Sequence, residues 1–196
     1  MRALTDNPVH DLIASRWSPY SFSNRSVSDE DLRSLFEAAR WAPSSYNEQP
    51  WSYIVAKRED AEEFARLLSC LVEGNQAWAK AASVLALGIS RLNFARNNKP
   101  NRAAIHDLGL AAGNLVLEAT ARGLSVHQMI GILPEQAREV YSVPEGYEPM
   151  TALAIGYASD PADVPEWRAR DAARRPRKPL KEFVFGGKWG VASGLF

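Results

Sequence analysis

Hydroxyl and amide side chains gather in residues 39–51 (ARWAPSSYNEQPW), with Trp41 and Trp51 on either side of them. Two serines, Asn47 and Gln49 stand close together in this segment. Such groups donate and accept hydrogen bonds, so beside an aromatic wall they suit a flat heterocycle whose rim needs both kinds of partner. Taken alone, Asn47 also fits a turn residue in the left-handed conformation. We expect this loop to bind a ligand.

The composition indicates one folded domain without a nucleic-acid or membrane partner. The 196 residues suffice for a core, and the hydrophobic share of 46% argues against disorder. Lys+Arg and Asp+Glu both number 23, so no net charge attracts nucleic acid or anionic lipid. No signal peptide or membrane-spanning pattern is visible, and the single cysteine, Cys70, suits a reducing cytosol as a buried thiol. We therefore expect a cytoplasmic protein.

The loop should lie between a helix and a strand. A helix capped by Ser28 with an acidic first turn leads into it, and the apolar residues 51–56 predict the strand that follows. A short helix ending near Ser15 is expected before it. Beyond it, the patterns predict a helix over 58–72 and a strand over 83–89 that is covered on both faces.

The C-terminal half adds the longest expected helix, residues 102–122. This helix is apolar almost all round, which indicates burial in the core or at a subunit interface. A strand over 124–130, a helix over 134–141 and a strand over 151–157 follow. Interspersed helices and strands without a linker predict one α+β domain over 1–196, with a mixed sheet between helical layers. Residues 160–196 lack a stable period and are expected to form an arm that packs on a twin subunit.

Four motifs in order along the chain resemble the flavin-binding framework of the nitroreductase family. The resemblance implies that family's three-layer sandwich, a mixed and mainly antiparallel sheet flanked by helices. It also implies FMN as cofactor and a homodimer with two FMN sites at the interface, each built by both subunits. The motifs contain Arg16, Trp17 and Ser18; Pro43, Ser44, Ser45 and Asn47; Met129, Ile130 and Gly131; and Arg175 and Arg177.

The resemblance assigns the FMN phosphate to Arg16, Ser18 and the pair Arg175 and Arg177. Guanidinium groups bind a phosphate dianion through charge-assisted, bidentate hydrogen bonds. The alternative is that Arg16 caps the end of its own helix and that the arginines near the C-terminus are solvated.

The flavin ring is assigned to Asn47 and to the backbone of residues 129–131. The family's asparagine at the position of Asn47 meets the ring edge, and N–H groups in the segment that matches 129–131 point at flavin N5. Gly131 would let the backbone approach the ring closely. The alternative for this segment is a simple strand end and turn.

Tyr20 departs from the family pattern, because Arg or Lys usually stands there near flavin N1 and O2. A tyrosine donates a hydrogen bond but brings no charge, so another cation, such as Lys80 or Arg91, would have to stabilise the reduced flavin. His127 lies beside the 129–131 segment and could face a substrate cavity or be a satisfied core histidine. The three histidines show no zinc spacing, so we expect no metal.

The function that the resemblance implies is electron transfer from NADH or NADPH to nitroaromatic, quinone or flavin acceptors by a ping-pong mechanism. No catalytic side chain is assigned, because the flavin carries the electron chemistry. Two alternatives stay open: other FMN chemistry on the same fold (dehalogenation, flavin fragmentation or substrate dehydrogenation), and a non-catalytic flavin-binding or interaction dimer. Neither the acceptor nor the choice between NADH and NADPH follows from these motifs.

Overall fold

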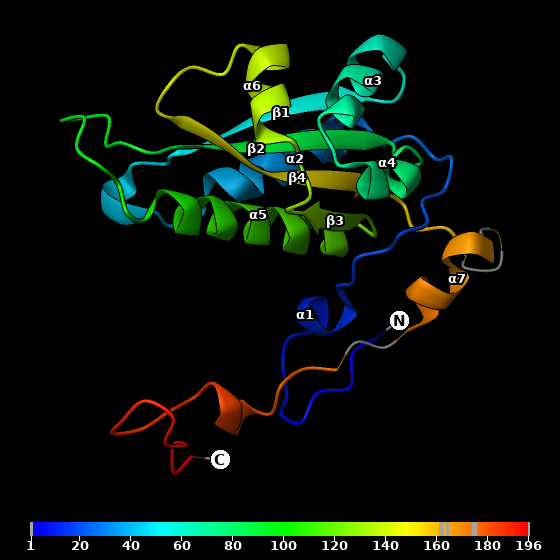
Figure 1. Cartoon of the computed structure of the whole chain (residues 1–196). Helices are drawn as coiled ribbons and strands as arrows, with labels where there is room; N and C mark the ends of the chain where they lie inside the picture. The colour runs from blue at the N-terminus through cyan, green and yellow to red at the C-terminus, as the bar shows by residue number, and fades with distance from the viewer. Residues whose placement is uncertain (1, 161–162, 164, 174–175, 196) are drawn as a thin grey trace.

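Four strands form one antiparallel sheet in the computed structural model of the chain, with helices against both of its faces (Figure 1). The structure describes residues 2–160, 163, 165–173 and 176–195. The spatial order of the strands is β1-β2-β4-β3, and each neighbouring pair is antiparallel. The strands are β1 (Trp51–Lys57), β2 (Val84–Arg91), β3 (Ser125–Met129) and β4 (Tyr147–Gly156).

Two helical layers cover this sheet, and each closes its own core. Leu35 of α2 (Asp29–Arg40) and Leu115 of α5 (Ala104–Ala121) pack in the core on one face. The core on the other face includes side chains of α3 (Ala61–Ser69), α4 (Glu73–Ala79) and α6 (Pro134–Tyr141). Alternate residues of β2 enter the two cores, and the strand is buried on both faces as expected. The α+β, three-layer prediction is confirmed.

Helix boundaries differ from the expectations where local hydrogen bonds or burial decide them. The helix expected over 58–72 is the shorter α3, which begins after Asp60, whose side chain accepts the Glu63 N–H, and ends at Ser69. The helix α4, which follows at Glu73, was not predicted. The first helix, α1 (Asp11–Ser15), begins where the His10 ring accepts the Leu12 N–H. The predicted helix over 134–141 matches α6.

One side of α5 remains outside the core. Leu108 and Leu115 are buried, whereas Ile105 is 44% and Leu110 is 36% exposed. A Cβ atom added at Gly109 or Gly113 would meet nothing within 4 Å, so this side is open space in the single chain. The expected burial of the helix is therefore complete on one side only.

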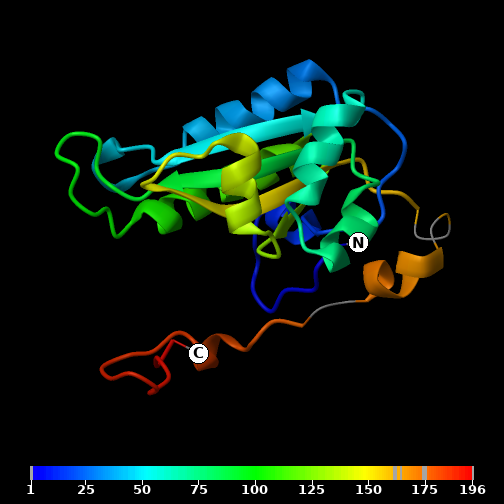
Figure 2. The same cartoon turned by 45° about the horizontal axis from the view of Figure 1, so that its top comes forward.

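The C-terminal segment extends away from the sheet. Helix α7 (Pro165–Ala172) was not predicted, and the residues after it run clear of the sheet and its helices in both views (Figures 1 and 2). Trp189 is 92% and Leu195 81% exposed. The described helices include none with the length and apolarity to span a bilayer.

Candidate functional site

A guanidinium group stands half-buried where α1 ends. Arg16 is the C-cap of this helix, and its Nη1 donates a hydrogen bond of 3.2 Å to Ser18 Oγ. Arg16 forms no ion pair with any residue that the structure describes. Arg16 therefore ends its own helix, as the alternative interpretation held, and its side chain also contacts Ser18.

The charge around Arg16 favours an anion. Burial lowers the pKa of the Arg16 guanidinium, and the positive charge of Arg177 lowers it further. The structure therefore brings Arg16, Ser18 and Arg177 together from opposite ends of the chain. Two neighbouring cations fit a phosphate dianion, which would offset both the burial of Arg16 and its repulsion by Arg177. Arg175 lies outside the described residues, and Trp17 is half-buried beside Arg16.

Tyr20 lies in an aromatic cluster. Its ring stacks on Trp167 of α7 with centroids 5.8 Å apart, and its edge contacts are Trp78 at 5.2 Å and His127 at 4.8 Å. The guanidinium of Arg170 lies 5.1 Å from the Tyr20 ring centroid. Arg170 is therefore a cation beside Tyr20, and a role of Lys80 or Arg91 near the flavin stays a prediction.

A buried carboxylate fastens α7 to this cluster. Asp171 is buried and accepts the N–H groups of Tyr20 at 2.7 Å and Ser21 at 3.0 Å. His127 is a satisfied core residue, because its Nδ1 lies 2.8 Å from the carbonyl oxygen of Pro19 and its ring packs 4.3 Å from Trp78. Neither Asp171 nor its role was visible in the sequence, since 151 positions separate Asp171 from Tyr20.

The predicted ring-binding loop is held in an uncommon backbone conformation. Tyr46, Asn47 and Gln49 have φ angles of 54°, 56° and 48°, in the left-handed region that side chains other than glycine seldom adopt. Ser44 Oγ accepts the Gln49 N–H at 3.0 Å, and Gln49 Nε2 donates to the Asn47 carbonyl at 3.0 Å. Asn47 thus has the left-handed backbone of a turn residue and is exposed, and its contact with a flavin ring stays a prediction.

A carboxylate from α5 braces this loop. Asp107 Oδ2 accepts the Ser45 N–H at 2.9 Å, and its Oδ1 lies 3.1 Å from His106 Nδ1. Asp107 is buried. Sequence reasoning missed this residue; its signal was a lone acid in the otherwise apolar start of the longest helix.

The 129–131 segment ends β3. Met129 is buried, Ile130 is 71% exposed, and the Met129 carbonyl accepts the Thr151 hydroxyl at 3.0 Å. The Gly131 carbonyl accepts Asn75 Nδ2 at 3.0 Å, and a Cβ at Gly131 would lie 2.5 Å from that nitrogen. A side chain at this position would displace the Asn75 amide from its hydrogen bond. The Gly131 N–H donates to no acceptor among the described residues.

The loop and the 129–131 segment are far apart within one chain. The register runs from Trp51 through Ser90 to Glu148, whereas Met129 pairs with Ala152. Three strand spacings of about 4.8 Å and four residues of about 3.3 Å place Trp51, which follows the loop, roughly 20 Å from Met129. Pro19 and Tyr20, by contrast, contact His127, two residues before Met129. One chain therefore holds the 16–20 and 129–131 segments together and the 43–49 loop apart from them.

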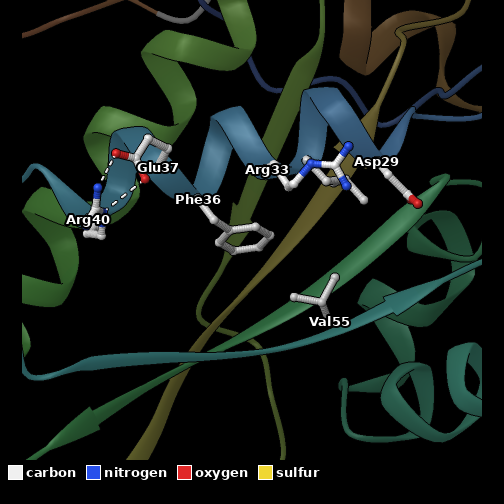
Figure 3. Close-up of a pocket in the computed structure, with 7 residues that line it drawn as sticks. Asp29, Arg33, Phe36, Glu37, Arg40 and Val55 are labelled. Atoms are coloured by element: carbon white, nitrogen blue, oxygen red, sulfur yellow. Dashed lines mark hydrogen bonds and ion pairs between the residues drawn. The ribbon is translucent and has the colours of Figure 1, made fainter.

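A groove of about 510 Å³ between α2 and β1 contains none of the predicted residues (Figure 3). Leu32, Phe36 and Val55 are its apolar lining. The charged residues on its rim follow one face of α2, and Arg40 pairs with Glu37 of the same helix. Asp29 pairs with Lys57, which lies outside the groove.

The comparisons with known proteins show the family to which the chain belongs. The model of the nitroreductase family matches residues 13–157. The solved structure of an oxidoreductase containing FMN is 34% identical, has a TM-score of 0.88, and covers 95% of this chain and 96% of its own. A nitroreductase family protein from Clostridium difficile 630 has a TM-score of 0.70 at 26% identity, with coverage of 90% and 96%. The major NAD(P)H-flavin oxidoreductase of Aliivibrio fischeri is 28% identical over 79% of this chain and 88% of its own.

The chain therefore belongs to the nitroreductase family, as the four motifs predicted. The family match ends at residue 157, before α7 and the C-terminal segment.

Proposed function

We propose that this protein is an FMN-dependent oxidoreductase that takes electrons from NADH or NADPH and passes them to nitroaromatic, quinone or flavin acceptors. The oxidoreductase class, the flavin and the nicotinamide donor follow from the family and from what its named relatives use. The observation within this chain that carries the proposal is the half-buried Arg16, beside Arg177 and Ser18, at a position where the family binds phosphate. A cytoplasmic location is part of the proposal.

The residues of this chain would bind and orient the cofactor. Arg16, Ser18 and Arg177 hold the phosphate, and the Gly131 N–H donates to the ring. FMN, when bound, accepts the hydride and supplies the electron chemistry. Because one site serves the donor and then the acceptor, the proposed kinetic scheme is ping-pong, and no side chain of the protein is required as acid or base.

The site is proposed to be completed by a second copy of the chain. The 43–49 loop lies roughly 20 Å from the 129–131 segment of its own chain, too far for both to contact one ring. In a two-fold dimer the Asn47 loop of one subunit would reach the ring held by the other. The open side of α5 and the exposed aromatic residues of the 160–196 arm are the surfaces proposed to pack on the partner.

Anaerobic spectroscopy of the purified protein tests the proposal. We expect a yellow protein with equimolar FMN whose visible absorbance bleaches with NADH or NADPH and returns on addition of menadione, nitrofurazone or riboflavin. FMN that stays oxidised with both donors would indicate the non-catalytic flavin dimer. Bleaching without recovery with any of the three acceptors would point to the other FMN reactions of this fold, such as dehalogenation.

A further inference from the structure

The segment after β2 is basic and has no acidic residue of its own. Between Glu73 and Asp107 the sequence contains only positive charges. Four of them lie within residues 91–102, which we call the basic loop: Arg91, Arg96, Lys99 and Arg102. In Figure 1 this loop projects beyond the end of the sheet, between β2 and α5.

The basic loop has a defined backbone. Asn93 forms a bridge with Pro100, Phe94 N–H donates to the Lys99 carbonyl at 2.8 Å, and Asn98 N–H donates to the Phe94 carbonyl at 2.9 Å. Its base is tied by the Leu92 carbonyl, which accepts the Asn101 N–H at 2.8 Å. The cations are therefore presented by an ordered turn.

The basic loop packs directly on the loop that contains Asn47. The rings of Tyr46 and Phe94 meet edge to face at 5.8 Å, and the guanidinium of Arg96 lies 4.2 Å from the Tyr46 ring centroid. The Glu48 carboxylate accepts the N–H of Ala95. This cation–π contact restrains the Arg96 guanidinium beside Tyr46.

The four cations are not neutralised within the described chain. None of them appears in an ion pair, and Arg96 makes only its aromatic contacts. The acidic groups near them are Glu48, which accepts the Ala95 N–H, the buried Asp107, which accepts the Ser45 N–H, Glu148, paired with Arg138, and the exposed Glu145. Positive charge is in excess on a molecule whose total charge is zero.

We propose that the basic loop binds the phosphates of the nicotinamide dinucleotide that reduces the flavin. This inference rests on the proposed function, in which the Asn47 loop meets the flavin ring. A nicotinamide stacked on that ring would carry its pyrophosphate one ribose away, and the basic loop contacts Tyr46, the neighbour of Asn47. Guanidinium and ammonium groups bind such oxygens through charge-assisted hydrogen bonds. A nucleic acid is a poorer fit, because the cations are confined to one short loop of a neutral chain.

Donors with and without phosphates test this inference. The rate of flavin reduction at subsaturating donor is measured anaerobically with NADH, NADPH and 1-benzyl-1,4-dihydronicotinamide, which has the same hydride-donating ring and no phosphate. We expect Arg96→Glu and Lys99→Glu each to lower the rate with NADH and NADPH at least roughly ten-fold, the effect of losing one charge-assisted contact. The rate with the benzyl compound should stay unchanged.

Arg33→Glu, an exposed charge reversal on α2, is the matched control and should alter none of the three rates. Lys99→Gln removes the positive charge of Lys99 without adding a negative one. The FMN content of this variant shows whether it is folded. Equal losses with all three donors, or no loss with the dinucleotides, would overturn the phosphate assignment while leaving the proposed function intact. A wild-type protein that none of the three donors reduces would overturn both.

Discussion

Arg16 is the residue on which the flavin assignment depends most directly. Its guanidinium is half-buried, its pKa is lowered by that burial and then by Arg177, and it contacts Ser18 Oγ. A protein seldom keeps such a charge partly buried beside a like charge without an anionic ligand.

We expect Arg16→Ala to weaken FMN binding by roughly ten- to a hundred-fold, the equivalent of ~1.5–3 kcal/mol for a lost charge-assisted hydrogen bond. Arg16→Lys keeps the charge but not the bidentate geometry, so its FMN affinity should lie between those of the wild type and Arg16→Ala. Flavin fluorescence titration of the apoprotein gives the affinities, with Arg33→Ala as the exposed control. Wild-type affinity in Arg16→Ala would refute the phosphate assignment.

Tyr53 carries a buried hydroxyl without a hydrogen-bond partner among the described residues. Its ring packs against Phe36 in the core between the sheet and α2. Burial raises the pKa of Tyr53 to about 12, from an ordinary value near 10. The free energy of unfolding should therefore be insensitive to this group below pH 10 and fall by up to about 2–3 kcal/mol as the pH rises from 10 to 12.

We expect Tyr53→Phe to keep or raise stability at pH 7 by up to about 1 kcal/mol, because it removes an unsatisfied polar group. Between pH 10 and 12 the free energy of unfolding of the variant should fall less than that of the wild type, because Tyr53 no longer ionises. Urea unfolding at pH 7, 10 and 11.5 gives the difference in free energy of unfolding between the two proteins. The contributions of the other tyrosines cancel in this difference. Identical pH dependence in the two proteins would show that the hydroxyl has a partner in solution.

At the scale of elements, the start of α5 supports the ring-binding loop. Three of the loop's residues have left-handed backbone angles, each costing on the order of 1 kcal/mol or more. The hydrogen bond from Ser45 N–H to the buried Asp107 carboxylate helps to offset that cost.

Asp107→Ala should lower the free energy of unfolding by about 1–3 kcal/mol, since it leaves the Ser45 N–H without its acceptor. FMN binding should weaken as well, because Asn47 would no longer be held in place. Chemical denaturation and flavin titration measure the two effects, with the exposed Glu62→Ala as control. If stability falls while FMN binding is unchanged, Asp107 supports the fold but not the site.

At the scale of the whole molecule, the open side of α5 is the informative surface. Leu115 is fully buried within its own chain, so its substitution would unfold the protomer and say nothing about assembly. A substitution at Gly113 tests assembly without affecting folding, because Gly113 faces open space in the single chain. A side chain there should not disturb the protomer and would gain helix propensity of about 1 kcal/mol over glycine.

We therefore expect Gly113→Glu to produce a folded protein that sediments as a monomer and retains little FMN. The wild-type protein should sediment as a dimer with FMN bound. Analytical ultracentrifugation, monitored at the flavin absorbance, distinguishes the two states. A Gly113→Glu protein that remains an FMN-loaded dimer would exclude this side of α5 from the interface.

Local sequence patterns predicted the helices that begin at a capping residue or a proline and the strand with a continuous apolar run. The strand β2 is continuously apolar, α2 has a serine cap and an acidic first turn, and α6 begins at a proline. Helix α4 escaped prediction because its sequence, EGNQAWA, has weak helix formers and depends on burial of Trp78. Helix α7 escaped it because Trp167 and Asp171 hold it to Tyr20, a contact without any local signature.

The sequence by itself determined the family and the residue types of the candidate site, since these depend on short motifs and their order along the chain. Only the tertiary structure decided how these motifs are distributed. The sheet register holds the Asn47 loop roughly 20 Å from Met129, and the fold brings Arg177 to Arg16. The physical reason is that such contacts join residues far apart in sequence, as Asp107 joins Ser45 across 62 positions. Their geometry follows from strand order and packing, which no local spacing encodes.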